Sequence, residues 1–228
     1  YYNRWTHEGY TIPDSMVKDT GVFIKGHSLR DKNILFAITG GIAASESLKI
    51  SRELRRYGAN LTIIMSKEAE KIITPLAVSW ASGKEVITGW NHDMPQLEDY
   101  DAGLGAPATR NTISKHIHGI MDSPLMMSLS AARGKNIPTL FVPSMHQDLF
   151  DDPVTLELLE LLDYENSFIM HEPLTEGKIK QSNPIQIVAK LSNIINSKLL
   201  NRKKIVITLG ANRSPIDSVR AIQNASSG

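Results

Sequence analysis

The chain contains no cysteine among its 228 residues. This absence excludes disulfides, thiolate metal sites and a cysteine that acts as nucleophile or acid. No apolar run approaches the roughly 20 residues that a membrane helix needs. A charge excess is also missing, because 25 basic and 24 acidic residues leave a net charge of +1, so the composition does not predict a nucleic-acid surface. The default expectation is therefore a cytoplasmic protein.

Short apolar runs and amphipathic stretches alternate along the chain from Asn33 onward. The run 34–39 is typical of a buried strand, and the stretch 43–57 places apolar side chains at helical spacing among charged ones. This alternation predicts an α/β fold, a Rossmann-like (flavodoxin-like), mostly parallel sheet with helices on both faces. In such sheets ligands bind beyond the carboxyl ends of the strands. Further strands are predicted at 61–65, 102–106, 138–142 and 167–170, and helices at 67–73, 75–82, 111–119, 124–133, 154–162 and 185–200.

The pattern divides the chain into three parts. Residues 1–31 are irregular but carry five aromatic residues, so we expect an arm that packs on a neighbour rather than a disordered segment. Residues 32–200 form the main domain. Residues 203–210 repeat the strand-then-glycine pattern at the start of that domain, but about 25 residues cannot fold alone. We therefore read 201–228 as the start of a second, truncated domain.

The stretch Ala-Pro-Ala-Thr-Arg-Asn-Thr at 106–112 lies between a predicted strand and a predicted helix. Its proline and small residues let the backbone approach a ligand closely. Thr109, Asn111 and Thr112 offer short polar side chains beside the free N–H groups of a helix N-terminus. This arrangement suits a phosphate or a planar polar ring. A plain capped helix start explains the same residues equally well.

A second candidate loop joins the first strand to the first helix. Gly40 and Gly41 permit a tight turn in front of a helix N-terminus, which attracts an anion. The loop is not a full dinucleotide fingerprint, because no acidic residue follows at the end of the next strand. Ser66 stands there instead, and a hydroxyl suits a mononucleotide phosphate or a ribityl chain. By itself the Gly-Gly pair also serves as ordinary turn chemistry.

Taken together, these loops resemble the flavin-dependent cysteine decarboxylase family. Within it they are similar to the bifunctional phosphopantothenoylcysteine decarboxylase/phosphopantothenate–cysteine ligases of coenzyme A synthesis, and most of all to archaeal members. The residues at 215–228 also resemble the start of the ligase half. Five motifs in order, with that start at the right distance, make the resemblance specific. The five are Thr39–Ala44, Thr74–Leu76, the 106–112 block, His118–Ile120 with Asp122, and Pro143–His146.

The resemblance implies FMN bound at a subunit interface in a homotrimer or a dodecamer built from trimers. It also implies that oxidation of the substrate thiol to a thioaldehyde makes the neighbouring carboxylate lose CO2, after which the electrons return and 4′-phosphopantetheine forms. The cofactor carries the difficult chemistry. The positions that match cofactor contacts in the family are Gly40, Gly41, Ile42, Ser66, Thr109, Arg110, Asn111 and Thr112.

Two histidines stand near the family's catalytic positions. Counting back from the 106–112 block places Asp93 where the family has its histidine, so a one-residue shift makes His92 the candidate base or carboxylate-orienting group. The family's Pro-Ala-Met-Asn is here Pro-Ser-Met-His, which makes Met145 and His146 candidates for holding the substrate carboxylate. An exposed loop histidine and a packing or helix-capping histidine are the respective alternatives.

The family's flap over the substrate carries a cysteine that supplies a proton, and this chain has none. The matching region, residues 176–180, is shorter. Lys178 is our candidate substrate contact from this flap, alongside Asn111, although Lys178 and Lys180 also fit a solvated run of charge. No metal site is predicted, because His116 and His118 at a spacing of two do not share a helix face.

The predicted function is FMN-dependent decarboxylation of phosphopantothenoylcysteine. CTP would be needed only by the ligase half, and we expect no ligase activity because most of that half is missing. The absent cysteine keeps two alternatives open. One is a flavoprotein of the same fold with other chemistry, such as pterin reduction or flavin prenylation, and the other is a non-catalytic FMN-binding subunit.

Overall fold

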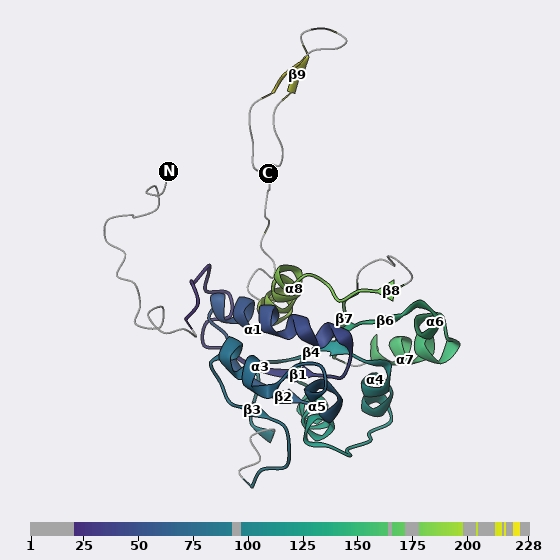
Figure 1. Ribbon diagram of the computed structural model, residues 1–228. Coiled ribbons are helices and arrows are strands. Elements are labelled where there is room, and N and C mark those ends of the chain that lie inside the picture. The colour runs from purple at the N-terminus through teal and green to yellow at the C-terminus, as the bar shows by residue number, and fades with distance from the viewer. Residues whose placement is uncertain are drawn as a thin grey trace. The chain divides into compact units, whose positions relative to one another are not determined.

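In the computed structural model the alternating pattern builds one sheet with helices on both of its faces (Figure 1). The structure describes residues 21–92, 97–163, 166–171, 178–197, 204, 213–215, 217 and 221–223. The strands of the sheet are β1 (Asn33–Ile38), β2 (Asn60–Met65), β3 (Val86–Ile87), β4 (Ala102–Ala108), β5 (Thr139–Pro143) and β7 (Ser167–Ile169). The helices are α1 (Ser47–Arg56), α2 (Lys67–Glu70), α3 (Pro75–Ser82), α4 (Arg110–Ile117), α5 (Pro124–Gly134), α6 (Gln147–Phe150), α7 (Pro153–Asp163) and α8 (Pro184–Asn196), with a 3-10 helix at Ile42–Glu46.

The sheet has the order β3-β2-β1-β4-β5-β7, and all of its neighbouring strands pair in parallel. The predicted α/β fold class is therefore confirmed. The chain winds outward from β1 first in one direction and then in the other, so β1 and β4 flank the point where the strand order reverses. Loops at such a switch point leave a crevice at the carboxyl edge of the sheet.

Side-chain alternation along β1 divides the core into two layers. Ile34, Phe36 and Ile38 pack with α1, α3 and α8 on one face of the sheet. Leu35 and Ala37 pack with α4, α5 and α7 on the other face. Because both faces are covered, the central strands are apolar along their whole length.

Three features differ from the sequence prediction. The predicted helix 43–57 is split, since a 3-10 turn precedes α1. The short strand β3 was not predicted. Neither was the two-residue pair β6 (Met145–His146) and β8 (Lys178–Ile179), which lie antiparallel. A strand of two residues is too short to show the alternation that identifies longer ones.

The chain divides into two units, Tyr1–Asn196 and Ser197–Gly228. In the first, the described end of the predicted arm packs on its own domain: Leu29 is buried, and its amide donates to the carbonyl oxygen of Tyr57 at 3.0 Å. In the second, β9 (Arg213–Pro215) and β10 (Ala221–Gln223) form an antiparallel pair. The described residues do not include 1–20. They also do not include the strand predicted within 203–210, except for Lys204. Among the described residues, no helix combines the length and the apolar character needed to cross a membrane.

Candidate functional site

The ends of β1 and β4 are joined by one buried threonine. The Oγ1 of Thr39 donates to the carbonyl oxygen of Pro107 at 2.7 Å and accepts from the amide of Thr109 at 3.0 Å. The Ala106–Pro107 peptide bond is cis, and the pairing of β4 with β5 shifts register between Gly105 and Ala108. Thr39 thus holds the start of the 109–112 segment against the loop after β1.

Gly40 is required by the close approach of α2. A Cβ at Gly40 would overlap the Cβ of Glu68 and lie 2.9 Å from the carbonyl carbon of that residue. Gly41 is different, because a Cβ there would meet only the Cγ2 of Thr109 at 3.7 Å, an ordinary contact. Ile42 follows with 83% of its side chain exposed, on the outside of the loop.

Hydroxyl groups cap α2 and α4, which both begin at this edge. The Oγ of Ser66 accepts from the amide of Ala69 at 3.2 Å, which caps α2. The Oγ1 of Thr109 caps α4 by accepting from the amide of Thr112 at 3.3 Å, and it also lies 3.0 Å from the Oγ1 of Thr112. The capping role predicted as the plain alternative for this segment is therefore real. It does not exclude ligand binding, because a hydroxyl oxygen can also donate.

A cavity of about 450 Å³ lies between these loops. Its size is in the range usual for small-molecule sites. It brings together five of the predicted cofactor positions, which come from three separate loops. The other three, Gly41, Ile42 and Arg110, are not among its lining residues. The five are Gly40, Ser66, Thr109, Asn111 and Thr112.

Arg110 forms an ion pair with a carboxylate outside the cavity. Its Nη1 forms an ion pair with Oδ2 of Asp152, just before α7, at 2.6 Å. The Val154 amide, which donates to Asp152, and the guanidinium of Arg110 together hold the pKa of that carboxyl below its ordinary value. Arg110 thus joins α4 to the start of α7, and any role toward a cofactor would share the guanidinium with this carboxylate.

Three predicted substrate residues meet in the β6–β8 pair. Met145 pairs with Ile179, and His146 pairs with Lys178, so the loop after β5 lies beside the predicted flap. Met145 is buried and His146 is exposed, with its Nδ1 3.3 Å from Oδ2 of Asp148. The residues 172–177 of the flap lie outside the described part of the chain.

His92 lies exposed on the loop that follows β3 and does not line the cavity. Trp90, two residues earlier, does line it and is largely exposed. Residues 93–96, which include Asp93, lie outside the described part. The assignment of His92 as the catalytic histidine, which needs a shift of one residue, therefore stays a prediction.

Sequence reasoning gave no site role to several residues that line the cavity, although it included Asp122 in a family motif. Trp90 follows a strand that was too short to predict. Lys115 and Asp122 line the cavity and form an ion pair at 2.5 Å. They lie seven residues apart, on either side of the end of α4, and no sequence pattern predicts an ion pair at that separation. Within the described ranges, no three His, Asp or Glu side chains are placed to hold a metal ion.

The parallel sheet is covered by helices on both faces, and its cavity lies among the loops at the carboxyl edge, where α/β proteins of this class bind their ligands. A comparison with family models matches residues 23–207 to the flavoprotein family and residues 200–228 to the DNA/pantothenate metabolism flavoprotein C-terminal domain. The chain belongs to the flavoprotein family. Its resemblance to the bifunctional enzymes of coenzyme A synthesis, including the start of their second domain, is thereby confirmed.

Curated relatives carry the name coenzyme A biosynthesis bifunctional protein CoaBC. The protein of Thermococcus kodakarensis is 36% identical over 211 residues, which cover 90% of this chain and 52% of the relative. That of Methanocaldococcus jannaschii is 34% identical over 220 residues, covering 95% and 53%. This chain thus spans about half the length of the curated relatives it matches.

Solved structures share the fold at low sequence identity. The FMN-dependent cysteine decarboxylase SpaF superposes with a TM-score of 0.64 at 19% identity, over 75% of this chain and 99% of that one. A PPC decarboxylase mutant complexed with pantothenoylaminoethenethiol gives 0.60 at 19%, over 71% and 97%. The FMN-binding protein AtHal3 gives 0.59 at 18%, over 78% and 100%.

Proposed function

We propose that this chain is the decarboxylase half of a bifunctional enzyme of coenzyme A synthesis, and that it converts phosphopantothenoylcysteine to 4′-phosphopantetheine with FMN. One observation carries the proposal: loops from three strands contribute Gly40, Ser66, Thr109 and Thr112 to a single cavity at the switch point of the sheet. The names of the curated relatives support the same activity.

The residues around the cavity fit a flavin mononucleotide. The hydroxyl and amide side chains that line the cavity suit a ribityl chain and a phosphate. When bound, FMN supplies the oxidation of the substrate thiol and the later return of the electrons. We assign the contacts to Gly40, Gly41, Ile42, Ser66, Thr109, Arg110, Asn111 and Thr112.

The substrate end of the site is formed by Asn111, Met145, His146 and Lys178 in this proposal. The pairing of β6 with β8 supports it, because it brings the last three together. The imidazole of His146 can donate a hydrogen bond to the substrate carboxylate and adds positive charge when protonated. His92 is proposed as the second catalytic group. A group other than cysteine must supply the late proton.

We further propose that residues 32–200 form the FMN-binding domain, after an arm at 1–31, and that 201–228 belong to a ligase domain. A homotrimer or dodecamer, with FMN at the interface, completes the proposal. Exposed apolar side chains support assembly: Ile42 at 83%, Leu76 at 69% and Trp80 at 57% exposure.

The decisive experiment mixes the FMN-loaded protein with phosphopantothenoylcysteine without oxygen and follows the mass of the product. Loss of CO2 is expected. His146→Asn, which restores the family residue, should keep the activity, whereas His146→Ala should lower it at least about tenfold, the worth of a hydrogen bond to a charged group. Unchanged substrate with flavin still bound would overturn the proposal.

The missing cysteine favours one alternative chemistry on the same scaffold. Turnover of a pterin, or prenylation of the flavin, without turnover of the cysteine adduct would establish it. Tight flavin binding with no turnover, together with co-purification of a second subunit, would instead identify a non-catalytic FMN-binding partner.

A further inference from the structure

A second and larger cleft, of about 820 Å³, lies between α1 and the segment that leads into α8. It is strongly basic, since five basic and two acidic side chains line it. The basic ones are Lys25, Lys49, Arg52, Arg56 and Lys180, and the acidic ones are Glu46 and Glu53.

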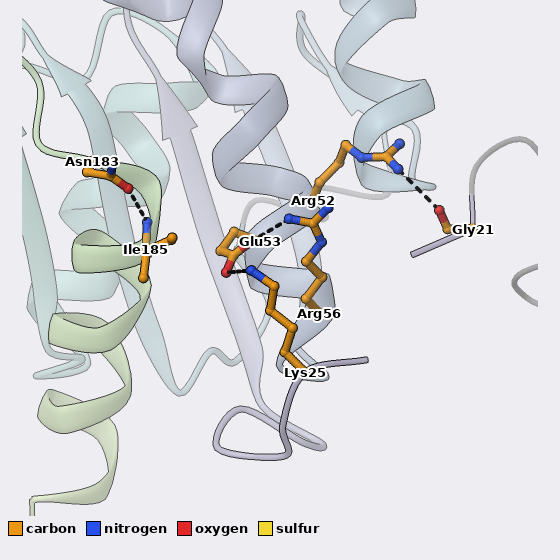
Figure 2. A network of polar contacts seen from close by, with 7 residues as sticks. All are labelled: Gly21, Lys25, Arg52, Glu53, Arg56, Asn183 and Ile185. Carbon is orange, nitrogen blue, oxygen red and sulfur yellow. Dashed lines mark hydrogen bonds and ion pairs between the residues drawn. The ribbon is translucent and has the colours of Figure 1, made fainter. Parts of the chain in front are cut away.

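The carboxylates of the cleft are already neutralised. Lys25 and Arg56 both converge on Glu53, at 2.8 and 2.7 Å (Figure 2). Glu46 lies 3.0 Å from Lys49, one turn along the helix. Arg52 lies on α1 between Lys49 and Glu53 in the sequence. The acceptor for its Nη2 is neutral, the carbonyl oxygen of Gly21 at 3.4 Å (Figure 2). No carboxylate of the described residues forms an ion pair with Arg52, so the cleft keeps excess positive charge.

The N-terminus of α8 adds a second attraction for an anion. This helix has 13 residues and no acidic residue in its first turn, so its positive end is not compensated. The Oδ1 of Asn183 caps it by accepting from the amide of Ile185 at 2.9 Å (Figure 2).

Ser182, the next residue back, is an independent sign of a ligand. It lines the cleft and is only 2% exposed, yet its Oγ has no hydrogen-bond partner among the described residues. A buried hydroxyl without a partner is unfavourable. Rotation of the Ser182 side chain toward the cleft would let a ligand oxygen accept a hydrogen bond from it.

The cleft is connected to the candidate active site by two segments. The 3-10 helix runs from Ile42 in the glycine loop to Glu46 in the cleft. On the other side, β8 pairs with Met145 and His146, and Lys180 follows it directly into the cleft. The cleft therefore adjoins, along the chain, both the glycine loop and the β6–β8 pair.

We propose that the cleft between α1 and α8 is a binding site for a phosphate monoester, held by Arg52, Lys49, Ser182 and the N-terminus of α8. Two sources share this chemistry. One is the phosphate of the decarboxylase substrate, an assignment that rests on the proposed function, and the other is a separate phosphorylated metabolite that binds without reacting.

The test titrates inorganic phosphate into the full chain saturated with FMN, so that the cofactor's own phosphate site is filled, and follows binding by broadening of the phosphorus NMR line at constant ionic strength. Saturable binding is expected. Arg52→Gln and Lys49→Gln should each weaken it about tenfold, the worth of one charged hydrogen bond. Arg30→Gln, an exposed arginine outside the cleft, is the matched control and should bind phosphate as the natural chain does.

Turnover then separates the two sources. If Arg52→Gln raises the KM for phosphopantothenoylcysteine but not for pantothenoylcysteine, with unchanged FMN content, the cleft holds the substrate phosphate. If phosphate binding weakens while both KM values stay unchanged, the ligand is a separate phosphomonoester. Phosphate binding that is absent, or equal in the natural chain, Arg52→Gln and Lys49→Gln, overturns the site. Because phosphate binding needs no turnover, failure of the decarboxylase proposal would be recognised separately.

Discussion

The imidazole of His116 lies near the end of α4 and is 3% exposed. Its ring packs on that of Phe141 with centroids 5.1 Å apart. Nearby, Nη1 of Arg133 donates to the carbonyl oxygen of His116 at 2.7 Å. Burial and then the charge of Arg133 lower the pKa of His116 to about 4. At neutral pH the folded chain therefore holds this histidine uncharged.

This shift predicts a stability loss in mild acid. In the unfolded chain the histidine protonates near pH 6.5, whereas in the folded chain it does so only near 4, so protons favour unfolding between these values. The loss should reach on the order of 3 kcal/mol across that window. His116→Gln should flatten the dependence, measured by urea unfolding at a series of pH values. His118→Gln, at the exposed end of the same helix, controls for removal of an imidazole, and equal slopes in both variants would contradict the prediction.

The pKa of Glu53 is also lowered in the folded chain, but by ion pairs rather than by burial. Burial raises the pKa of its carboxyl, but hydrogen bonds and charge from Lys25 and Arg56 outweigh this, and the pKa is lowered. The resulting stability is present above the unfolded pKa, near 4.3, and is lost as pH falls through the folded value. Glu53→Gln should cost about 2 kcal/mol at pH 7, because two cations lose a charged acceptor.

The control for Glu53 is Glu70→Gln, which removes an exposed pair with Lys67. Such surface pairs contribute less than about 1 kcal/mol. Urea unfolding of both variants at pH 7 measures the difference. Equal losses would mean that burial of Glu53 has no bearing on the strength of its ion pairs.

At the scale of elements, the glycine loop after β1 offers a matched pair of substitutions. Gly40→Ala should destabilise the cofactor-free chain by several kcal/mol or displace α2, because the added methyl has no room beside Glu68. Gly41→Ala should change stability by less than about 1 kcal/mol, since its contact is ordinary and its backbone is extended. Thermal unfolding without FMN compares them, and similar melting temperatures would refute the steric argument.

The elements that the sequence predicted well have local causes. The strands of the sheet are apolar because both faces are covered, and the starts of α3 and α4 carry their caps, Thr74 and Thr109, in the sequence. The elements that it missed have distant causes. The pair β6–β8 exists only because two segments more than thirty residues apart meet, and neither segment alone shows a strand pattern.

The candidate site follows the same division. Gly40, Ser66, Thr109, Asn111 and Thr112 could be predicted because each follows the end of a strand, and the carboxyl ends of parallel strands share one edge. The partner of Arg110 could not, because Asp152 lies 42 residues further on and the approach depends on how α4 and α7 pack. The basic cleft was not predicted either, since it is formed by α1 and a segment more than a hundred residues later.

At the scale of the whole molecule, large apolar side chains are exposed on several elements, and two of them share one helix face. Leu76 and Trp80 are four residues apart on α3 and are 69% and 57% exposed. Monomeric proteins seldom leave large apolar side chains grouped in this way. The proposed assembly would cover them with a second copy of the chain.

This grouping predicts that Leu76→Asp combined with Trp80→Asp disrupts the assembly, because a buried carboxylate without a partner opposes association. Light scattering of the FMN-saturated protein should show the mass falling from a multiple of the chain to a single chain. FMN should also be released more readily if the cofactor lies at the interface. The control is Leu161→Asp, the same kind of substitution at an exposed apolar side chain on α7. It should leave the mass unchanged. A variant on α3 that keeps both its mass and its flavin would show that the α3 face is not the contact, whereas monomers that retain FMN would separate cofactor binding from assembly.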